Sequence, residues 1–579
     1  MLTSPSSLNA GTGTGYTFPR SASKTSTQAL TVVPTFSSLS LYWKAETGKA
    51  GQEGLVRFRK KGTSAWYQGH PLWFDGRNQA QTPARNGEFR GSIVSLAAGA
   101  EYEIQVMNGS TGELVTATAK TWSATFPVAK TVTLGNSSRQ TLTISESGTA
   151  SGYILYTAAP GATATLDGEN AVTSNIVVNG SYIIIRGLTL KGAKRVGILL
   201  GEDAHHVVIE RNDISGFGRI AADGWGEPND GGIMHWNSKQ SVTAFVIQNN
   251  KIHHPRSDSN NWREYRPSKQ TSHPTGARAI GFWTPGSNNV IRFNDIYSDD
   301  DHYFADGIGG GWGGTFRGFP GADSDIIGNR VTHAWDEGIE SDGGNQNVRI
   351  GGNYLDEIYH AISASPVSIG PLYVYRNVSH RTSVDGIVSK GSFLKIQSRT
   401  QEGVFYGNSR VYVYHNTLYR TSPTVGTKVG VQPSGSDLVN VVTLNNIFHV
   451  ADKPIDDPSM DPSNLFDYDL YWGYLNTGTN QERHGIRQLP QYDASAVSGP
   501  YTLKSRSPGQ DDGVYIPNFN RAYKGSAPDR GAQERDAGPL MFGTRDWPVV
   551  AGKQRAKSCR QDACLAGDGA SPWSFPRQP

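Results

Sequence analysis

Cysteine is almost absent from this sequence. Cys559 and Cys564 are the only two cysteines in 579 residues, and no neighbouring histidine completes a metal-ligand set with them. A metal site built on this pair alone is therefore not expected. A small local disulfide between the two residues would fit an oxidising compartment.

A strong charge imbalance and long apolar runs are also missing. The 54 Lys and Arg residues nearly balance the 51 Asp and Glu residues, which argues against a dedicated nucleic-acid binder. No run approaches the roughly 18 apolar residues of a membrane helix, so no membrane span is expected. The first twenty residues lack the apolar core of a signal peptide. We therefore expect a mature secreted or periplasmic protein whose export signal is absent from this chain, in preference to a cytosolic protein.

What is abundant points to β-structure. The chain has 68 glycines, 25 tyrosines and 13 tryptophans, while charged residues make up only 18%. This mixture is typical of an all-β protein with many turns and an aromatic-lined surface, and aromatic faces are good platforms for flat apolar ligand faces. The length predicts two or more domains.

Residues 1–26 are rich in Ser, Thr and Gly, and we expect them to be disordered. Residues 27–124 alternate apolar and polar residues in short stretches with the spacing of a small β-sandwich. Trp43 stands where such a sandwich buries its core tryptophan. The segment "SLAAGAEYEIQV", with Leu96 and Tyr102, resembles the tyrosine corner of fibronectin type III domains. The resemblance implies an accessory or spacer module, and no convergent polar cluster suggests catalysis there.

After residue 125 a short motif recurs. A β-branched run is followed by Asn, one further residue and usually an aliphatic residue, as in "HVVIERNDI" and "NVRIGGNYL". The motif's asparagines are Asn212, Asn250, Asn294, Asn329, Asn353, Asn377, Asn416 and Asn445. Two successive intervals are 24 residues, which is the period of a solenoid with insertions on one side. Stacked asparagines can hydrogen-bond their neighbours above and below.

This pattern resembles the right-handed parallel β-helix of pectate lyases, polygalacturonases and related polysaccharide-degrading enzymes. The resemblance implies that residues 125–545 form a right-handed parallel β-helix with an irregular C-terminal part, followed by a tail at 546–579. It is specific for the fold and not for the reaction.

The asparagines also align the segments that follow them, and these share an isoleucine column. Its members are Ile233, Ile280, Ile308, Ile339, Ile362 and Ile387. We expect this column to be buried and the residues two before, one after and three after each isoleucine to face outward. Two positions before, the outward column holds Arg278, Asp306, Glu337, His360 and Asp385. Three positions after, it holds Trp236, Trp283, Gly311, Asp342, Ser365 and Lys390.

One face of the predicted helix therefore gathers acids. Asp306, Glu337, Glu340 and Asp342 are the predicted catalytic residues, because repulsion among clustered carboxylates raises at least one pKa, as a general acid requires. We expect Asp336 to point inward or into the preceding turn and to be structural. Around the acids, we predict that the substrate is bound by Arg278, His360, Lys390, Lys395, Arg399, Trp236, Trp283 and Trp312. Two long insertions are expected to wall this face, with Trp262 and Tyr265 as further sugar platforms.

Three functions fit this pattern. The first is an inverting glycoside hydrolase without a cofactor, with Glu340 as general acid and Asp342 or Asp306 as base. The second is a polysaccharide lyase in which the carboxylates hold Ca²⁺ and Lys390 or Arg399 removes a proton. The third is a non-catalytic glycan-binding β-helix. In each case the partner is a polysaccharide or oligosaccharide, and the sequence leaves the oligomeric state open.

Overall fold

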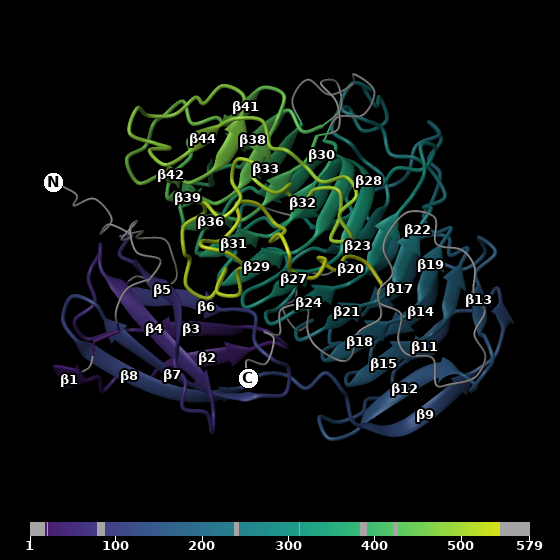
Figure 1. Cartoon of the computed structure of the whole chain (residues 1–579). Helices are drawn as coiled ribbons and strands as arrows, with labels where there is room; N and C mark the ends of the chain where they lie inside the picture. Colours follow the sequence, from purple (N-terminus) through teal and green to yellow (C-terminus); the bar gives the residue numbers. More distant parts are fainter. Residues whose placement is uncertain are drawn as a thin grey trace.

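The computed structural model describes residues 18–19, 21–77, 87–236, 242–311, 313–382, 391–420 and 426–544. The described residues form strands and turns in two parts, a small N-terminal domain and a long right-handed parallel β-helix (Figure 1). No helix in this part of the chain has the length and hydropathy needed to cross a membrane. The expected all-β fold class is therefore confirmed.

The N-terminal domain is one sheet of eight described strands folded around its own core, in the order β1-β8-β7-β4-β5-β6-β3-β2. Trp43 is fully buried there and stacks on Phe89, with ring centroids 5.5 Å apart. The hydroxyl of Tyr102 accepts a hydrogen bond from the Ala97 amide. The likeness to fibronectin type III domains stays a prediction. The strands are β1 (Lys24–Thr25), β2 (Thr31–Pro34), β3 (Leu39–Trp43), β4 (Glu53–Lys60), β5 (Tyr67–Asp75), β6 (Glu88–Ile93), β7 (Glu101–Asn108) and β8 (Glu113–Lys120).

Strand β1 falls inside the segment 1–26, which was expected to be disordered. It pairs with β8, so the expected disorder does not extend to Lys24. The tail 546–579, with both cysteines, lies outside the described residues.

The β-helix has a parallel sheet on one side in which twelve described strands stack in chain order. Their interior side chains belong to one continuous apolar core that runs from Ile144 to Tyr471. These strands are β9 (Val128–Leu134), β12 (Tyr153–Ala158), β15 (Ile183–Arg186), β18 (Val207–Glu210), β21 (Val246–Gln248), β24 (Val290–Arg292), β27 (Asp325–Ile327), β29 (Val348–Gly351), β31 (Leu372–Tyr375), β36 (Val411–Tyr414), β39 (Val441–Leu444) and β42 (Leu465–Asp467).

The remaining strands of the coils form two parallel series that merge into one sheet, because two long strands belong to both. These are β28 (Arg330–Glu340) and β30 (Tyr354–Ala364). The first series, which follows the twelve-stranded sheet in each coil, is completed by β10 (Ser137–Ser138), β13 (Thr165–Asp167), β16 (Thr189–Lys191), β19 (Asp213–Ser215), β22 (Lys251–His253), β25 (Asp295–Tyr297), β32 (Val378–Ser379), β37 (Thr417–Leu418), β40 (Ile447–His449), β43 (Leu470–Trp472) and β44 (Ile486–Arg487).

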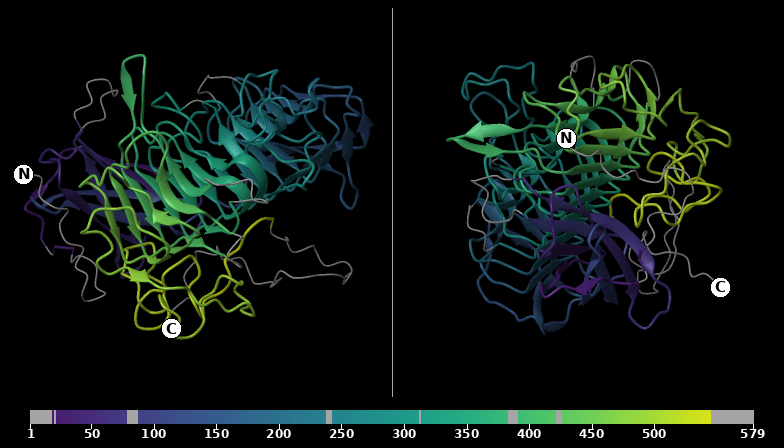
Figure 2. Two further views of the ribbon diagram at one scale, coloured as in Figure 1. Left: turned by 90° about the horizontal axis from the view of Figure 1, so that it is seen from above. Right: turned by 90° about the vertical axis from the view of Figure 1, so that its left-hand side faces the viewer.

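The second series carries the isoleucine column and is completed by β11 (Leu142–Ile144), β14 (Ser174–Val178), β17 (Val196–Leu200), β20 (Gly231–His235), β23 (Arg278–Phe282), β26 (Ile308–Gly310), β33 (Ser392–Ile396), β38 (Val429–Pro433) and β41 (Lys453–Ile455). After β33 the chain makes an antiparallel hairpin, β34 (Arg399–Gln401) and β35 (Val404–Tyr406), which projects from the body of the helix (Figure 2).

The predicted asparagine column is a hydrogen-bonded ladder. In each step, one asparagine donates its backbone N–H and its side-chain amide to the side-chain oxygen of the asparagine in the next coil. For Asn329 and Asn353 these distances are 2.9 and 3.0 Å. The residue before each ladder asparagine has a positive φ, for example 57° at Arg211 and 52° at Arg376, which turns the chain sharply between two sheets.

The last predicted member of the ladder is wrong by one residue. Asn416 donates to Asn446, and Asn446 donates to Asp469, which continues the ladder as an acceptor. Asn445 instead occupies the positive-φ position before the ladder residue, a conformation that asparagine tolerates well. Two consecutive asparagines, "NN", made the two positions indistinguishable in the repeat motif.

The isoleucine column is confirmed for five of its six members. Ile233, Ile280, Ile308, Ile339 and Ile362 pair in succession, and each is fully buried. Ile362 then pairs with Leu394, so the assignment of Ile387 to this column is wrong. The insertion before β33 is longer than the alignment assumed, and residues 383–390 lie outside the described residues. Asp385 and Lys390, which were placed by that alignment, fall in the same segment.

The N-terminal domain packs beside the later coils, although the chain enters the β-helix at its opposite end (Figures 1 and 2). It lies against the outer side of the twelve-stranded sheet, where Tyr373, Tyr412 and Phe519 form a buried aromatic cluster with Val94. Arg349, fully buried, pairs with Asp325 and donates to Ser40 and Ser92 of the N-terminal domain. The domain is therefore docked directly on the helix and not held away from it as a spacer.

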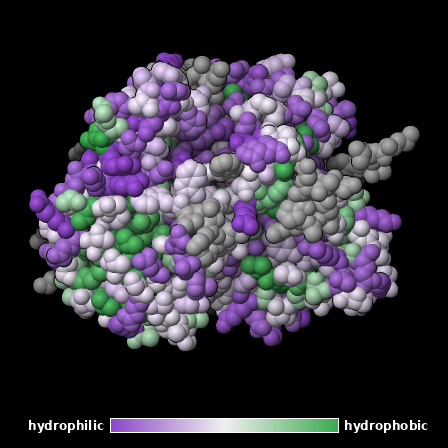
Figure 3. Space-filling model, turned by 180° about the vertical axis from the view of Figure 1, so that it is seen from behind, coloured by the Kyte–Doolittle hydropathy of each residue, from purple (hydrophilic) through white to green (hydrophobic). Residues whose placement is uncertain are grey.

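The C-terminal segment after β44 folds back over the helix. Asn518 exchanges two hydrogen bonds with the backbone of Val94, and the Arg530 guanidinium donates to the carbonyl of Asp469 at the end of the ladder. On the face opposite to that of Figure 1, the coloured residues form separate hydrophobic patches among hydrophilic ones (Figure 3).

Asn353→Ala removes one rung of the ladder. The buried backbone N–H of Asn329 and one N–H of its side-chain amide lose their acceptor, while the other side-chain N–H keeps the carbonyl of Ile291. We expect a loss of about 2–4 kcal/mol in the free energy of unfolding, measured by chemical denaturation. Asn480→Ala, at an exposed position, is the matched control and should cost little. A ladder that contributes nothing would show equal stabilities for the two variants.

Arg349→Ala strands the buried Asp325 carboxylate at the interface of the two domains. The expected cost is about 3–5 kcal/mol, the range for one partner removed from a buried ion pair. Arg139→Ala breaks an exposed ion pair with Glu169 and should cost about 0–1 kcal/mol. Thermal unfolding of both variants checks this, and equal effects would mean that the interface is not held by Arg349.

Candidate active site

Five successive coils build the acidic face. At the position two residues before the isoleucine column, successive coils carry Arg278, Asp306, Glu337, His360 and Ser392. One residue after the column they present Gly281, Gly309, Glu340, Ser363 and Lys395. Because adjacent parallel strands lie about 4.8 Å apart, neighbouring members of each column are in contact range. The structure therefore brings Asp306, Glu337, Glu340 and Asp342 together, as the sequence predicts.

Asp336 belongs to the same cluster, which corrects the expectation of a structural residue pointing away from it. Ala334 pairs with Ile358 and Glu337 pairs with His360, so β28 carries two residues where β30 carries only Tyr359. Such a β-bulge breaks the alternation of side chains along the strand. The ligand atoms of Asp306, Asp336 and Glu337 consequently lie within 4.8 Å of one another. Strict alternation, assumed from the sequence, could not place Asp336 here.

Three basic side chains contact these acids. The Arg278 guanidinium donates to Asp306 at 2.6 Å, and the Lys395 ammonium donates to Glu337. Nε2 of His273 lies 3.1 Å from Asp336, from the long insertion between β22 and β23. The sequence identified Arg278 and Lys395 as substrate-binding candidates, whereas His273 was missed because nothing in a loop sequence shows which coil the loop will reach.

The cluster gathers five carboxyl groups in a buried place. Asp306, Asp336 and Glu337 are each 3% exposed, and among the described residues Arg278 and Lys395 supply permanent positive charge to the cluster. Burial and the neighbouring Glu337 carboxylate raise the pKa of Asp336 well above its usual value. Burial also raises the pKa of Asp306, although Arg278 opposes the shift. Both acids therefore keep their protons to a higher pH than an exposed carboxyl group does.

Glu337 is the exception at the centre of the cluster. Burial acts to raise its pKa, but Lys395, His360 and a hydrogen bond from Asp336 outweigh burial and lower it to about 2. The same contact raises the pKa of the Lys395 ammonium, so that this lysine stays protonated. Glu337 and Lys395 thus form a permanent ion pair inside a group of acids whose pKa values are raised.

Glu340 has the strongest reason to keep its proton. Its pKa is raised well above the usual value by burial and by Asp306 and Asp342. Oε2 of Glu340 has no hydrogen-bond partner among the described residues. It lies over Gly309 of the preceding coil, 2.8 Å from the place that a Cβ would take, so a glycine there leaves room for the carboxyl group.

Asp342 lies at the edge of the cluster and is held in a fixed orientation. Its Oδ1 accepts hydrogen bonds from the Ser363 hydroxyl at 2.9 Å and the Ser365 backbone N–H at 2.6 Å. Burial raises its pKa to about 6, against the opposing effect of Lys395. Asp342 is therefore the acid of this cluster whose charge changes just below neutral pH.

His360 is buried beside the acids. Its Nδ1 lies 2.8 Å from the Ser392 hydroxyl, and burial together with Lys395 lowers its pKa to about 3. It is therefore neutral at pH 7, and it lies within the site and not on an unrelated surface.

The predicted aromatic residues are only partly placed. The Trp283 ring lies over Gly311, next to Asp342 in the same outward column. Trp236 lies farther along the helix, where it packs against the Arg195 guanidinium, 4.2 Å from the ring centroid, and donates to the carbonyl of Asn229. Trp312 and Lys390 lie outside the described residues.

Arg399 lies at the base of the projecting hairpin. It donates to the carbonyl of Ser365 at 3.2 Å and to the Gln397 side chain at 2.8 Å. These bonds place it beside the Asp342 end of the cluster.

Asp306, Asp336 and Glu337 fit a hard cation in their donor chemistry. Ca²⁺ prefers carboxylate oxygens, and Oδ1 of the buried Asp336 has no hydrogen-bond partner among the described residues. Arg278 and Lys395 already neutralise two of the three carboxylates, so a divalent ion there would share its ligands with two cations.

Three solved structures are similar to this chain at low identity. An alginate lyase from a Paenibacillus species is 16% identical with a TM-score of 0.28, over 55% of this chain and 92% of that chain. The catalytic unit of a thermostable GH87 α-1,3-glucanase from Streptomyces thermodiastaticus is 11% identical with a TM-score of 0.28, over 78% and 84%. A GH87 α-1,3-glucanase catalytic domain in complex with tetrasaccharides is 9% identical with a TM-score of 0.28, over 79% and 90%.

No family model matches the chain, and no curated protein matches it. The three structural neighbours are polysaccharide-degrading enzymes that include both a lyase and hydrolases. Their similarity is too low to decide between these reactions.

Asp342→Asn should stabilise the protein at alkaline pH. Because the pKa of Asp342 is raised from 3.8 to about 6, its contribution to stability is complete below about pH 4 and is lost as the pH rises through 6. Asparagine keeps an oxygen for Ser363 and Ser365 without the charge. We expect a gain of about 1–3 kcal/mol at pH 8 and none at pH 4.

Chemical denaturation at the two pH values measures this difference. Asp203→Asn, at an exposed position, is the control and should show no pH-dependent gain. A variant equally stable or less stable than the parent protein at pH 8 would contradict the raised pKa.

Proposed function

We propose that this protein is a glycoside hydrolase that cleaves a polysaccharide with inversion of configuration. The observation that carries the proposal is that buried acids lying side by side differ strongly in pKa. The pKa of Glu340 is raised well above its usual value, that of Glu337 is lowered to about 2, and that of Asp342 is raised to about 6. A glycosidase needs one carboxylic acid and one carboxylate flanking the bond that it cleaves.

Each acid has a role that follows from its protonation state. Glu340, with a free Oε2, donates its proton to the leaving oxygen as general acid. Asp342, oriented by Ser363 and Ser365, accepts a proton from the attacking water as general base. Asp342 follows Glu340 by two residues, just past the end of β28. Two residues of extended chain span about 6.7 Å, which is nearer the roughly 6.5–9.5 Å of inverting enzymes than the roughly 5–5.5 Å of retaining ones.

Glu337 supports the reaction without exchanging a proton. Its carboxylate stays ionised beside Lys395 and lies on the same strand, β28, as Glu340. A fixed negative charge stabilises the positive charge that develops on the sugar ring in the transition state. A secreted or periplasmic location, where polysaccharides are met, remains part of the proposal.

A Ca²⁺-dependent polysaccharide lyase is the second candidate, favoured by the close grouping of Asp306, Asp336 and Glu337. A bound Ca²⁺ would supply neutralisation of a uronate carboxylate. The side chains near it are poor bases, however, since Lys395 is held protonated by Glu337 and the pKa of His360 is lowered to about 3. The hydrolase therefore fits the arrangement better. A glycan-binding protein without activity is the remaining alternative.

The test is product analysis on a panel of polysaccharides. We expect new reducing ends without the ultraviolet absorbance of unsaturated products, and activity that survives EDTA. Unsaturated products, with activity lost in EDTA and restored by Ca²⁺, would establish the lyase instead. No products from any polysaccharide would favour the non-catalytic alternative.

Glu340→Gln should lower turnover at least about a hundredfold, a typical loss for a general acid, while substrate binding stays close to that of the parent protein. Glu146→Gln, an exposed residue of an early coil, is the control and should retain full activity. The acidic limb of the parent's pH–rate profile should lie near pH 6, where Asp342 ionises. Near-parental rates in both Glu340→Gln and Asp342→Asn would remove the cluster from the chemistry.

A further inference from the structure

A cavity of about 420 Å³ opens beside the acidic cluster. His360 lines it and lies next to Glu337 in the adjacent coil. Gln432, which also lines the cavity, pairs in register with Lys395. The cavity therefore continues the acidic face toward the C-terminal end of the helix and begins where the proposed catalytic acids end.

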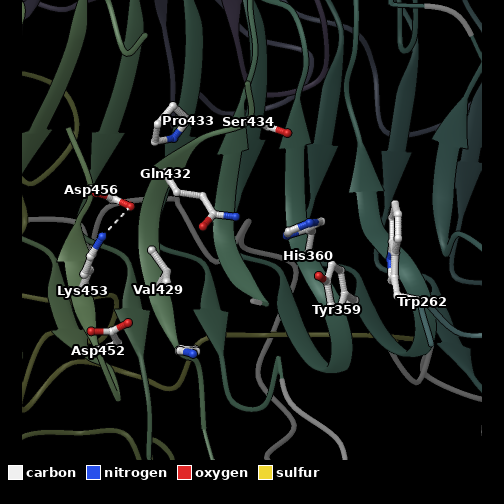
Figure 4. A pocket seen from close by; sticks show the side chains of 11 residues that line it. Trp262, Tyr359, His360, Val429, Gln432, Pro433, Ser434, Asp452, Lys453 and Asp456 are labelled. Carbon is white, nitrogen blue, oxygen red and sulfur yellow. Dashed lines mark hydrogen bonds and ion pairs between the residues drawn. The ribbon is translucent and has the colours of Figure 1, made fainter. Parts of the chain in front are cut away.

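One end of the cavity is aromatic. Trp262 and Tyr359 lie at this end, with Gln432 between them and the charged residues of the far end (Figure 4). Their rings stack with centroids 5.4 Å apart and an interplanar angle of 29°. An aromatic face offers a flat apolar platform for the C–H face of a sugar ring. Trp262 also packs against His273, which ties this wall to the loop that contacts Asp336.

The other end presents an unused donor and an unused acceptor. Lys428 and Asp452 lie opposite one another in adjacent coils, where the Asp452 N–H donates to the Lys428 carbonyl at 3.0 Å. The pattern of hydrogen bonds and ion pairs in the described part of the chain gives neither side chain a partner. By contrast, Asp456 accepts from both Lys453 and Asn476, so its oxygens are already used.

The charges of the cavity cancel. Lys428 and Lys453 offset Asp452 and Asp456, and His360 is neutral because its pKa is lowered to about 3. In the adjacent acidic cluster Arg278 and Lys395 pair with Asp306 and Glu337, and the raised pKa values of Asp336 and Glu340 limit the negative charge further. An anionic sugar therefore gains no net attraction from this surface.

An uncharged sugar can use the same groups through hydrogen bonds alone. A hydroxyl group is both a donor and an acceptor, so neighbouring hydroxyls of one ring can accept from Lys428 and donate to Asp452. Tyr359 and Asp452 lie on coils three steps apart, with β33 and β38 on the coils between them. At about 4.8 Å per step, their coils are separated by roughly 14 Å along the helix axis.

We propose that this cavity is a subsite for uncharged pyranose units of the substrate, with Trp262 and Tyr359 as its platform and Lys428 and Asp452 as its hydroxyl clamp. The inference rests on the proposed function in that it takes the cavity to hold the glycan next to the cleaved bond. It narrows the substrate class to a neutral glycan that lies along the helix axis.

The experiment is a binding titration of the full chain carrying Glu340→Gln, so that bound sugar is not turned over. The probes are neutral disaccharides of gluco, galacto, manno and xylo configuration and the disaccharide of galacturonic acid, followed by ligand-observed NMR. We expect saturable binding of at least one neutral probe and tighter binding of that probe than of the uronate. Lys428→Met and Asp452→Asn should each weaken it about tenfold, the effect of a lost hydrogen bond to a charged group.

Lys49→Met, an exposed lysine of the N-terminal domain, is the matched control and should bind as the parent does. Binding of no neutral probe, tighter binding of the uronate, or unchanged binding in both clamp variants overturns the subsite. Intact neutral binding with no cleavage of any polysaccharide leaves the subsite standing and refutes the hydrolase. Cleavage of a polysaccharide at an unchanged rate in both clamp variants refutes the subsite and leaves the hydrolase standing.

Discussion

The stacking of one coil on the next is the constraint on which the rest of this structure depends. The buried asparagine ladder fixes the register, because each asparagine satisfies the backbone and side chain of its neighbour and no other alignment provides those bonds. Once the register is set, residues from distant parts of the chain become neighbours at strand spacing. Asp306, Glu337 and Lys395 meet only because their coils are stacked in this order.

The buried acidic cluster destabilises the folded protein, and interactions elsewhere in the fold offset this loss of stability. Buried carboxyl groups of like charge destabilise a protein unless they are protonated or paired. Here Arg278 and Lys395 pair with two acids, and the pKa values of Asp336 and Glu340 are raised well above their usual range. The long apolar core, the ladder and the docked N-terminal domain outweigh this local cost. A purely structural cluster would lower the stability of the protein without any benefit. We therefore take these acids as the candidate site.

Regular features of the fold could be predicted from the sequence, because they repeat. The ladder and the isoleucine column recur once per coil, and four of the five clustered acids follow from them by alternation. Prediction failed where the chain departs from regularity. The bulge that turns Asp336 into the site, the "NN" step at Asn445 and the long insertion that displaces Ile387 each break the period by a local rearrangement.

Contacts between distant parts of the chain also could not be predicted from the sequence. His273 reaches Asp336 through a loop whose path depends on packing, and the N-terminal domain docks on coils far from its own connection to the helix. Such contacts carry no periodic signal. The buried Arg349 and the aromatic cluster around Tyr373 show that side chains of both the N-terminal domain and the β-helix form this interface.

The proposed chemistry depends on how protons are distributed among the buried acids. Titration of side-chain carboxyl signals by NMR, in protein labelled with ¹³C at the glutamate carboxyl carbon and assigned by Glu337→Gln and Glu340→Gln, measures this directly. We predict that the Glu340 carboxyl remains protonated at neutral pH, while Glu337 stays ionised down to about pH 2. A Glu340 signal that titrates at the usual value of a solvent-exposed glutamate would contradict it.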